Sequence, residues 1–535
     1  MAAQRGLPAR ARRARAAALL VVLLVPAGCR SPDADFPRTI SHAWDTPEET
    51  SMGQDIRKAA PADPELSGIY VLPTGQDAFA ARVLLAHHAE RAIDLQTYIL
   101  DDDLTGRYLL GQLLEAADRG VRVRLLVDDL NARAAEANLA ALDAHPGVEV
   151  RLFNPFSRSF WPGLTRMFDF MVHPVRLNHR AHNKSFSADG AIAIVGGRNI
   201  GDAYFDASPD VNFADLDLIA IGPAARQVGA DFDLYWQSEH AVPMAAWRSL
   251  RRGPEDVDAL RARLAEHAEA NRDTSYARSV RDSDIVAQVL AGDVPLVWAR
   301  VKACADLPAK ITASSDEMPE LVLGRDVIPV ARAVQRELVL VSPYFVPGDA
   351  GMAWFRELRG RGVRVRILTN ALSATDVPFV HSGYERYRRE LLELGVELHE
   401  LQASAAAPAG DDRHGLFGSS GASLHAKSFV FDGHTVFVGS LNFDPRSAEL
   451  NTEQGLLVES PEIAAHLIEL FDKGALPSVS YRLELQPTGD GEETEMVWTG
   501  EENGQPVRYT SDPHAGFGTR CLVWIGGLLP IEGQL

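Results

Sequence analysis

An internal repeat constrains the fold of this chain more than any other feature of its 535 residues. Residues 93–100 predict a strand, a helix then stops at Gly120, and residues 121–127 predict a second strand. The same order recurs in residues 338–368, where the helix stops at Gly362. The two Gly-Val-Arg-Val-Arg segments begin at 120 and 362, so the copies are 242 residues apart. A duplicated strand–helix–strand unit predicts two α/β lobes, each with a mixed sheet flanked by helices.

Each copy continues into a second shared motif. Residues 182–190 read His-Asn-Lys-Ser-Phe-Ser-Ala-Asp-Gly, and residues 425–433 read His-Ala-Lys-Ser-Phe-Val-Phe-Asp-Gly. An apolar run follows each, and then Gly-Gly-Arg-Asn at 196–199 or Gly-Ser-Leu-Asn at 439–442. The motifs begin at 182 and 425, 243 residues apart, which matches the first offset within one residue. Two collinear repeats with a common offset indicate a duplicated domain.

This motif is expected to bring polar side chains to one point. Residues two apart on a strand face the same side, so the His and the Lys project together. The Asp-Gly pair favours a tight hairpin turn that returns the chain, with its Asn, beside the His-x-Lys. An imidazole, an ammonium and an amide suit an anionic phosphodiester, and two imidazoles allow nucleophilic attack and acid–base catalysis. The candidate catalytic residues are His182, Lys184 and Asn199 with their counterparts His425, Lys427 and Asn442.

Four carboxylates accompany the two motifs. Asp189 and Asp432 belong to the candidate catalytic set, but each precedes the Gly of a predicted turn, so we expect a structural role more than a chemical one. Glu453 follows the second motif, and Asp215 occupies the aligned position after the first. We expect each of these two to hold the His of its own copy by the far ring nitrogen and to fix its tautomer. The alternative for either is a surface acid.

The two segments are identified as HKD motifs of the phospholipase D superfamily, with the pattern H-x-K-x(4)-D-x(6)-G-[GS]-x-N. The second copy matches in full, whereas the first has Gly197 where Ser is usual, so one hydroxyl contact is missing there. Four sequence segments resemble those of the bacterial cardiolipin synthase branch, especially its C type. These segments are residues 176–186, 194–201, 369–376 and 528–532. The resemblance extends over residues 68–535.

The resemblance implies a duplicated phospholipase D fold with one composite active site between the lobes. It implies a phosphohistidine intermediate, in which His182 is the nucleophile and His425 protonates the leaving alcohol and then activates the incoming hydroxyl. Phosphate oxygens would be held by the two lysines, Asn199, Asn442 and Ser440. The superfamily needs no metal and no cofactor, and the sequence contains no metal-ligand cluster.

The first 28 residues predict a secretory signal. Five Arg residues between positions 5 and 15 precede a short apolar run at 16–25, and Ala-Gly-Cys follows at 27–29. This resembles a bacterial lipoprotein signal, with Pro26 where Leu is usual, and Cys29 would then be lipidated. An ordinary cleaved signal is the alternative. We therefore expect a bacterial envelope protein on the periplasmic side, lipid-anchored to a membrane.

Composition divides the remaining chain. Residues 29–67 lack periodicity and predict a tether, residues 68–239 form the first lobe, and residues 294–535 form the second. Between the lobes, residues 240–293 predict a polar helical connector.

Two further stretches are ambiguous. From Phe153 to Arg180, aromatic residues alternate with arginines, which suits contact with lipid and equally suits core packing. His381, Tyr384 and Arg388 share one helical face, which lines a headgroup pocket or is simply solvated.

The favoured function is phosphatidyl transfer that makes cardiolipin or a related phospholipid, with phospholipid substrates and a membrane surface as partners. A hydrolytic phospholipase D, an exported nuclease and a catalytically dead lipid-binding scaffold are the alternatives. The net charge of −20 disfavours a nucleic-acid partner. Intact His, Lys and Asn residues in both copies disfavour a dead site. The sequence leaves the donor lipid, the acceptor alcohol and the oligomeric state open.

Overall fold

The computed structural model describes residues 36–157, 169, 174–246, 256–313, 317–403, 422–488 and 493–528. Strands of the first half of the chain are β1 (Leu66–Leu72), β2 (Ala92–Ile99), β3 (Arg122–Asn131), β4 (Val148–Phe153), β5 (Ser185–Ala188), β6 (Ile192–Gly196), β7 (Asn212–Ala214), β8 (Asp217–Ile221) and β9 (Ala241–Pro243). Helices of this half are η1 (Pro47–Glu49), α2 (Ser51–Ala59), α3 (Gly75–His88), α4 (Leu104–Asp118), α5 (Glu136–Leu142), α7 (Pro174–Asn178), η2 (Asp202–Tyr204), α8 (Pro223–Gln237), α9 (Val257–Asn271), α10 (Ser275–Arg281) and α11 (Asp284–Ala291).

Strands of the second half are β10 (Val297–Ala305), β11 (Glu337–Val341), β12 (Arg364–Asn370), β13 (Glu397–Leu401), β14 (Ala422–Leu424), β15 (Ser428–Phe431), β16 (Thr435–Gly439), β17 (Gln454–Glu459), β18 (Ser480–Pro487), β19 (Thr494–Glu502) and β20 (Gln505–Tyr509). Its helices are η4 (Pro308–Thr312), α12 (Met318–Leu321), α13 (Gly324–Ala333), α14 (Gly348–Gly360), α15 (Pro378–Glu385), α16 (Arg388–Glu393), η5 (Arg446–Leu450), α17 (Pro461–Gly474) and α18 (Phe517–Leu528).

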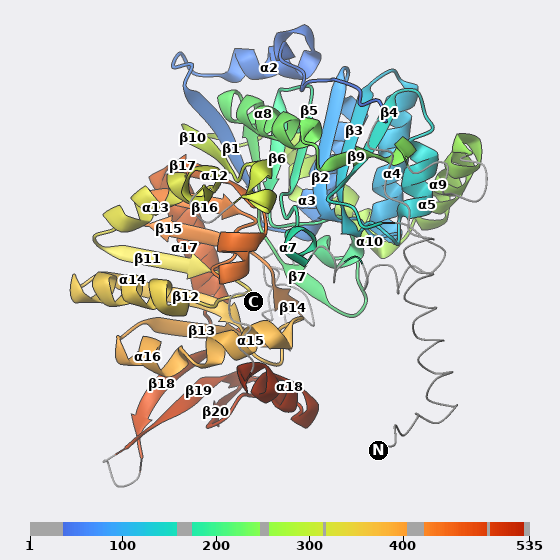
Figure 1. Cartoon of the computed structure of the whole chain (residues 1–535). Coiled ribbons are helices and arrows are strands. Elements are labelled where there is room, and N and C mark those ends of the chain that lie inside the picture. Colours follow the sequence, from blue (N-terminus) through green and yellow to red (C-terminus); the bar gives the residue numbers. More distant parts are fainter. Residues whose placement is uncertain are drawn as a thin grey trace, which may run out of the picture.

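One mixed sheet of 18 strands runs through both lobes (Figure 1). Its spatial order is β9-β4-β3-β2-β5-β6-β8-β1-β10-β17-β16-β15-β11-β12-β13-β18-β19-β20. The predicted α/β duplication with mixed sheets is confirmed. The two sheets are continuous because β10 pairs with β1 on one side and with β17 on the other. The lobes are therefore two halves of one hydrogen-bonded layer.

The predicted βαβ units lie at equivalent places in the two lobes. β2, α4 and β3 form the first unit, with β2 and β3 parallel, and β11, α14 and β12 repeat this arrangement. The helices are followed by Gly120 and Gly362 at φ values of 93° and 81°, a left-handed conformation that glycine adopts without steric penalty. The helix-ending role that the sequence predicts for these glycines is confirmed.

Both Asp-Gly hairpins are also confirmed. Asp189 and Gly190 connect β5 to β6 with φ values of 54° and 62°, and Asp432 and Gly433 connect β15 to β16 with 55° and 64°. Positive φ at both central residues is the geometry of a type I′ turn, which Asp-Gly favours.

A shared apolar core joins the lobes behind the site. One buried cluster contains Val195 and Leu218 from the first lobe together with Val438 and Leu456 from the second. These side chains come from four strands next to the motifs: β6 and β16 follow the two His-x-Lys segments, and β8 and β17 follow the two carboxylates. Sheet continuity and common packing thus fix the position of one lobe relative to the other.

The predicted tether is wrong from residue 36 onward. Backbone oxygens of this segment accept hydrogen bonds from buried arginines, at Ser41 from Arg124 (2.9 Å) and at Thr39 from Arg151 (2.6 Å). Met52 and Ile56 of α2 pack against the first core. The contacts at Thr39 and Ser41 use backbone oxygens, which leave no pattern in the sequence.

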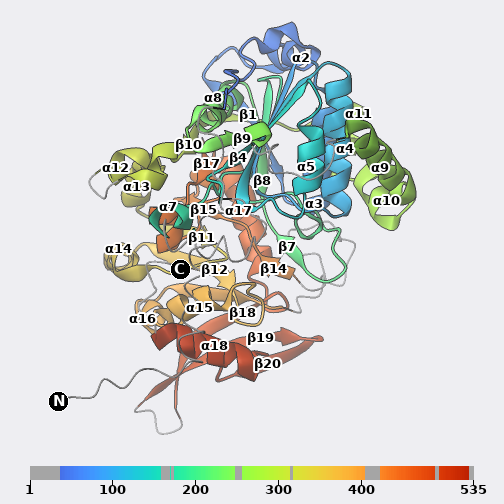
Figure 2. The same cartoon turned by 45° about the vertical axis from the view of Figure 1, so that its right-hand side comes forward.

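Residues 257–291 of the predicted connector are helical, and these helices pack on the first lobe instead of bridging the two lobes. β9 adds to the first sheet beside β4, and α9, α10 and α11 pack on α3, α4 and α5 of the first lobe (Figure 2). Leu260, Leu264 and Ile285 are the buried apolar side chains that hold these helices there. The direct connection between lobes is instead the pairing of β10.

Candidate active site

The two motifs meet where the lobes face each other. Short β14, which precedes the second motif, pairs in parallel with β7 of the first lobe (Figures 1 and 2). The mirror contact is a parallel bridge between Ala181, before the first motif, and Thr452 of the second lobe. Each histidine is then fixed by its backbone, since His182 N donates to Thr452 O at 2.9 Å and His425 N donates to Ala214 O at 2.8 Å.

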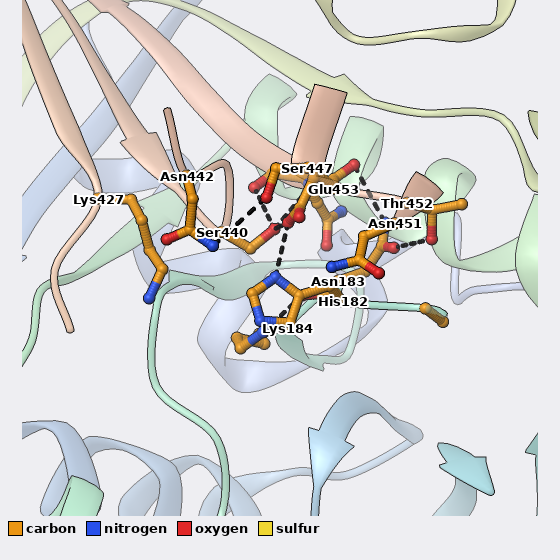
Figure 3. Close-up of polar contacts among 12 residues, drawn as sticks. His182, Asn183, Lys184, Lys427, Ser440, Asn442, Ser447, Asn451, Thr452 and Glu453 are labelled. Carbon is orange, nitrogen blue, oxygen red and sulfur yellow. Dashed lines mark hydrogen bonds and ion pairs between the residues drawn. The ribbon is translucent and has the colours of Figure 1, made fainter. Parts of the chain in front are cut away.

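The histidine–carboxylate pairs cross between the lobes. His182 Nδ1–H donates to Glu453 Oε2 at 2.8 Å, and His425 Nδ1–H donates to Asp215 Oδ2 at 2.5 Å (Figure 3 shows the first pair). The expectation that each carboxylate serves its own copy is therefore wrong. The residue before each carboxylate forms the backbone contact with the opposite motif, which carries the carboxylate across the boundary. With Nδ1–H engaged, the lone pair of each imidazole is on Nε2.

The two lysines lie just before β5 and β15 rather than within a strand. Lys184 Nζ donates to His182 O at 2.6 Å, and Lys427 Nζ donates to His425 O. Burial lowers the pKa of Lys184 to about 7 and that of Lys427 to about 8, against the opposing attraction of Glu453 and Asp215. Each ammonium also acts electrostatically on the histidine of the other lobe, so the four side chains form one site.

Burial sets the protonation of the histidines. It lowers the pKa of His182 to about 4 despite the attraction of Glu453, and together with Lys427 it lowers the pKa of His425. Burial acts to raise the pKa of both carboxylates, but the contacts with His182 and His425 hold them below their usual values. Both imidazoles are therefore neutral near pH 7, and below pH 7, where Lys184 keeps its charge, two ammonium groups balance two carboxylates in a buried site.

The amide and hydroxyl groups differ between the lobes. Asn199 Oδ1 accepts from Ile99 N at 3.2 Å, and its buried Nδ2 lies near the Tyr204 hydroxyl without a well-formed hydrogen bond in the described part of the chain. Asn442 Nδ2 instead donates to Ser447 Oγ at 3.3 Å. The predicted phosphate-binding role of Ser440 does not fit, because its hydroxyl donates to Glu453 Oε2 at 2.5 Å and its oxygen accepts from Gln454 N. Ser440 orients the carboxylate.

Gly197 explains the asymmetry of the motif. A Cβ at this position would lie 2.1 Å from Asp215 Oδ1. The first lobe thus combines a glycine with the shorter carboxylate, whereas the second combines Ser440 with the longer Glu453. Asp215 takes its second hydrogen bond from Leu216 N at 2.8 Å instead of from a hydroxyl.

Asp189 and Asp432 do not belong to the catalytic set. The Asp189 carboxylate accepts from the backbone N–H groups of residues 90–92 at 2.8–2.9 Å, and Asp432 accepts from those of residues 335–337 at 2.7–3.2 Å. Each lies five residues beyond its Lys along an extended strand, a distance of about 16 Å. They fasten the hairpins to the sheet, so the structural expectation holds and the catalytic assignment is wrong.

Aromatic side chains around the histidines are part of the site that sequence reasoning missed. The Tyr98 ring lies 5.2 Å from that of His182, and Tyr204 and Phe213 lie 5.3 and 5.1 Å from His425. Lys184 Nζ lies 5.6 Å from the Tyr98 ring. The only local signal was the placement of Tyr98 at the end of a predicted strand.

The two ambiguous stretches have different outcomes. Most of the aromatic stretch lies outside the described residues, and of its described ends Phe156 is core, with Arg180 4.6 Å from its ring. His381, Tyr384 and Arg388 are all buried, so the solvated face is wrong. Arg388 pairs with Glu400 at 2.9 Å and Asp512 at 2.8 Å, which makes the cluster an internal ion-pair network.

The described residues contain no group of three or more His, Cys, Asp or Glu side chains arranged to hold a metal ion. Among the helices that the structure describes, none is long and apolar enough to cross a membrane. Cys29 lies outside the described residues.

A duplicated α/β fold whose halves share one site with two histidines defines the class of phospholipase D-like proteins. Within that class, the chain belongs to the family described as "Cardiolipin synthase, PLD-like domain", whose model matches residues 84–236 and 328–474.

The relatives agree with this family. The chain is 40% identical to "Cardiolipin synthase C" of Escherichia coli (strain K12), over 88% of this chain and 97% of the relative. It is 25% identical to "Cardiolipin synthase" of Oceanobacillus iheyensis, over 76% and 68%. The crystal structure of phosphatidylserine synthase from Haemophilus influenzae Rd KW20 matches with a TM-score of 0.50 and 13% identity, over 83% of this chain and 92% of that one. At that identity the likeness concerns the fold.

Proposed function

We propose that this protein is a phosphatidyltransferase that makes cardiolipin or a related phospholipid through a phosphohistidine intermediate. The observation that carries the proposal is the pair of neutral imidazoles, each held at Nδ1 by a carboxylate of the opposite lobe. Such imidazoles present two Nε2 atoms to one substrate, with Lys184 and Lys427 beside them. The name of the Escherichia coli relative supports the lipid substrate.

In the first half-reaction, His182 Nε2 attacks phosphorus, and an N–P bond forms as the P–O bond to the leaving alcohol breaks. His425 gives its Nε2 proton to that alcohol. In the second, His425 removes the proton of the incoming hydroxyl, whose oxygen attacks phosphorus and releases His182. Lys184, Lys427 and the Nδ2 of Asn199 stabilise the negative oxygens.

Charge balance explains how His425 obtains its proton. The empty site is neutral when two ammonium groups face two carboxylates and both imidazoles are uncharged. A bound phosphodiester adds one negative charge, which one proton on His425 compensates. Asp215 stabilises the resulting imidazolium at 2.5 Å, as a carboxylate does in other histidine sites. Substrate binding and proton uptake are therefore coupled.

The products separate transfer from hydrolysis. Water is present at about 55 M, so a transferase must position a lipid hydroxyl, and well-oriented groups reach effective molarities of about 10⁵ M or more. Vesicles containing phosphatidylglycerol should yield mainly a dimeric phospholipid and a small alcohol, analysed by mass spectrometry. Added short primary alcohol should divert product to the matching phosphatidyl alcohol. Phosphatidic acid alone would identify a hydrolase, and DNA cleavage without lipid turnover would identify a nuclease.

The proposed location is the periplasmic side of the envelope, with Cys29 as a lipid anchor. The basic start, the short apolar run and Ala27-Gly28-Cys29 support it. Cys29→Ser should abolish labelling by a clickable fatty acid and release part of the protein from membranes. Equal labelling of wild type and variant would contradict this anchor.

A further inference from the structure

Helix α18 carries large apolar side chains on its solvent face. Phe517 is 85% exposed, Trp524 is 68% exposed and Ile525 is 45% exposed. At 100° per residue these side chains share one side of the helix with Cys521, which is partly exposed. A surface helix of a globular protein normally turns such residues inward.

The opposite side of α18 packs on α15 through small residues. Val523 and Gly526 are buried, and a Cβ on Gly526 would lie 2.7 Å from Ser382 Oγ of α15. The face of α18 that carries small residues therefore packs closely on α15, and the face that carries large apolar residues is exposed to solvent. In Figures 1 and 2, α18 lies beside α15 at one end of the second lobe.

α15 extends the same apolar surface toward the active site. Val377 and Phe379 are 36% and 37% exposed. The residue before them, Asp376, accepts from Tyr344 Oη at 2.9 Å and acts electrostatically on Lys427. Asn370, six residues earlier, exchanges two hydrogen bonds with Leu424, which directly precedes the second catalytic histidine. One short segment therefore links the apolar surface to the site.

We propose that this surface docks on the lipid bilayer from which the active site takes its substrate. The apolar surface is defined as Phe517, Leu522, Trp524 and Ile525 of α18 with Phe379 of α15 and Val377, which directly precedes α15. The inference rests on the proposed function, because a phospholipid substrate is found in a bilayer and an enzyme acting on it needs a face that sits there.

The chemistry of α18 fits a bilayer interface. Its 12 residues span about 18 Å, too short to cross an apolar layer of about 30 Å. Arg520 is the one charged residue of the helix, and its guanidinium donates to Asp512 O at 2.8 Å and to Ala515 O at 3.2 Å. Trp side chains are enriched at membrane–water interfaces, where the ring is buried in the apolar layer and the N–H stays near water, and Trp524 and Phe517 face outward on this helix.

The test compares two presentations of the same lipid. Full-length wild type is compared with Phe517→Ser/Trp524→Ser and with the control Leu290→Ser, which removes an 83% exposed leucine from α11 of the first lobe. On phosphatidylglycerol vesicles the double variant should lose about tenfold or more in kcat/KM, since membrane affinity scales with buried apolar area. On short-chain phosphatidylglycerol below its micelle concentration, all three proteins should agree within about twofold.

A second measurement reports insertion directly. An environment-sensitive fluorophore on Cys521 should shift to the blue and resist aqueous quenchers when vesicles are added, with Cys521→Ser as the labelling control. Cys304 is 1% exposed and should not react, and the labelled protein carries Cys29→Ser so that the third cysteine contributes no signal.

Three outcomes overturn the proposal: an equal loss on monomeric lipid, an unshifted probe, or vesicle turnover unchanged in the double variant. A dimer that dissociates in the double variant, without a change on vesicles, would assign the surface to a second copy of the chain. Wild type inactive on every lipid, with the probe still shifted by vesicles, would refute the proposed function and leave the docking surface intact.

Discussion

Neutralising the two crossed carboxylates should have unequal effects, which the hydrogen bonds around them determine. His182 Nδ1 and Ser440 Oγ both donate to the same oxygen of Glu453, Oε2, while Oε1 is buried without a partner among the described residues. In Glu453→Gln, an amide oxygen at the Oε2 position keeps both hydrogen bonds and the histidine tautomer. This variant therefore loses the negative charge but keeps the positions of the hydrogen-bonded groups nearly unchanged.

Asp215→Asn cannot keep both of the hydrogen bonds that the wild-type carboxylate accepts. Its two carboxylate oxygens accept from different donors, Oδ2 from His425 Nδ1–H and Oδ1 from Leu216 N–H. Whichever way the asparagine amide turns, its NH₂ group opposes one of these donors or forces His425 into the other tautomer. A lost hydrogen bond to a charged group costs about 1.5–3 kcal/mol, or about 10- to 150-fold in rate.

Both variants should lose at least about 100-fold in kcat/KM for phosphatidyl transfer, with Asp215→Asn roughly a further 10- to 100-fold lower. Steady-state kinetics on phosphatidylglycerol vesicles measure this, and thermal unfolding of each variant checks that it folds. Glu459→Gln and Asp210→Asn, both exposed, are the matched controls. Equal losses, or a larger loss for Glu453→Gln, would refute the reasoning.

Three further predictions concern the same site. His182→Ala and His425→Ala should each remove nearly all turnover, and the effect of the double variant should be far from the sum of the two. Enzyme quenched with acid during turnover of labelled substrate should carry the phosphate on His182. Label on His425 alone would reverse the two roles. The kcat/KM should rise with pH through about 4, as His182 loses its proton. It should fall at higher pH, because His425 must take up a proton on substrate binding, and fall more steeply as pH passes about 7, where Lys184 loses the charge that binds phosphate; a flat profile between pH 6 and 9 would contradict both roles. Gly197→Ser, although Ser is the usual residue at this position of the motif, should lose activity about tenfold or more because its Cβ displaces Asp215, whereas the control Gly360→Ala, with open space around it, should not.

Local sequence sufficed for the repeated units because their signals act over a few residues. Apolar periodicity and the glycines at 120 and 362 determine the βαβ units, and Asp-Gly determines the type I′ hairpins. The turn position of Asp189 also indicated its structural role before any contact was known. Residues 36–67 escaped this reasoning because part of their contact with the first lobe uses backbone atoms, which every sequence has, as at Thr39 O and Ser41 O.

The sequence by itself determined the polar side chains at the centre of the site, which are two copies of His, Lys and Asn with one carboxylate after each motif, but not the aromatic rings that pack on the histidines. It did not determine which carboxylate serves which histidine, since His182 and Glu453 are 271 residues apart and no local pattern encodes their contact. The tertiary structure decided this pairing. The strand β10 and the shared core set one lobe against the other, and that docking places each carboxylate beside the histidine of the opposite repeat.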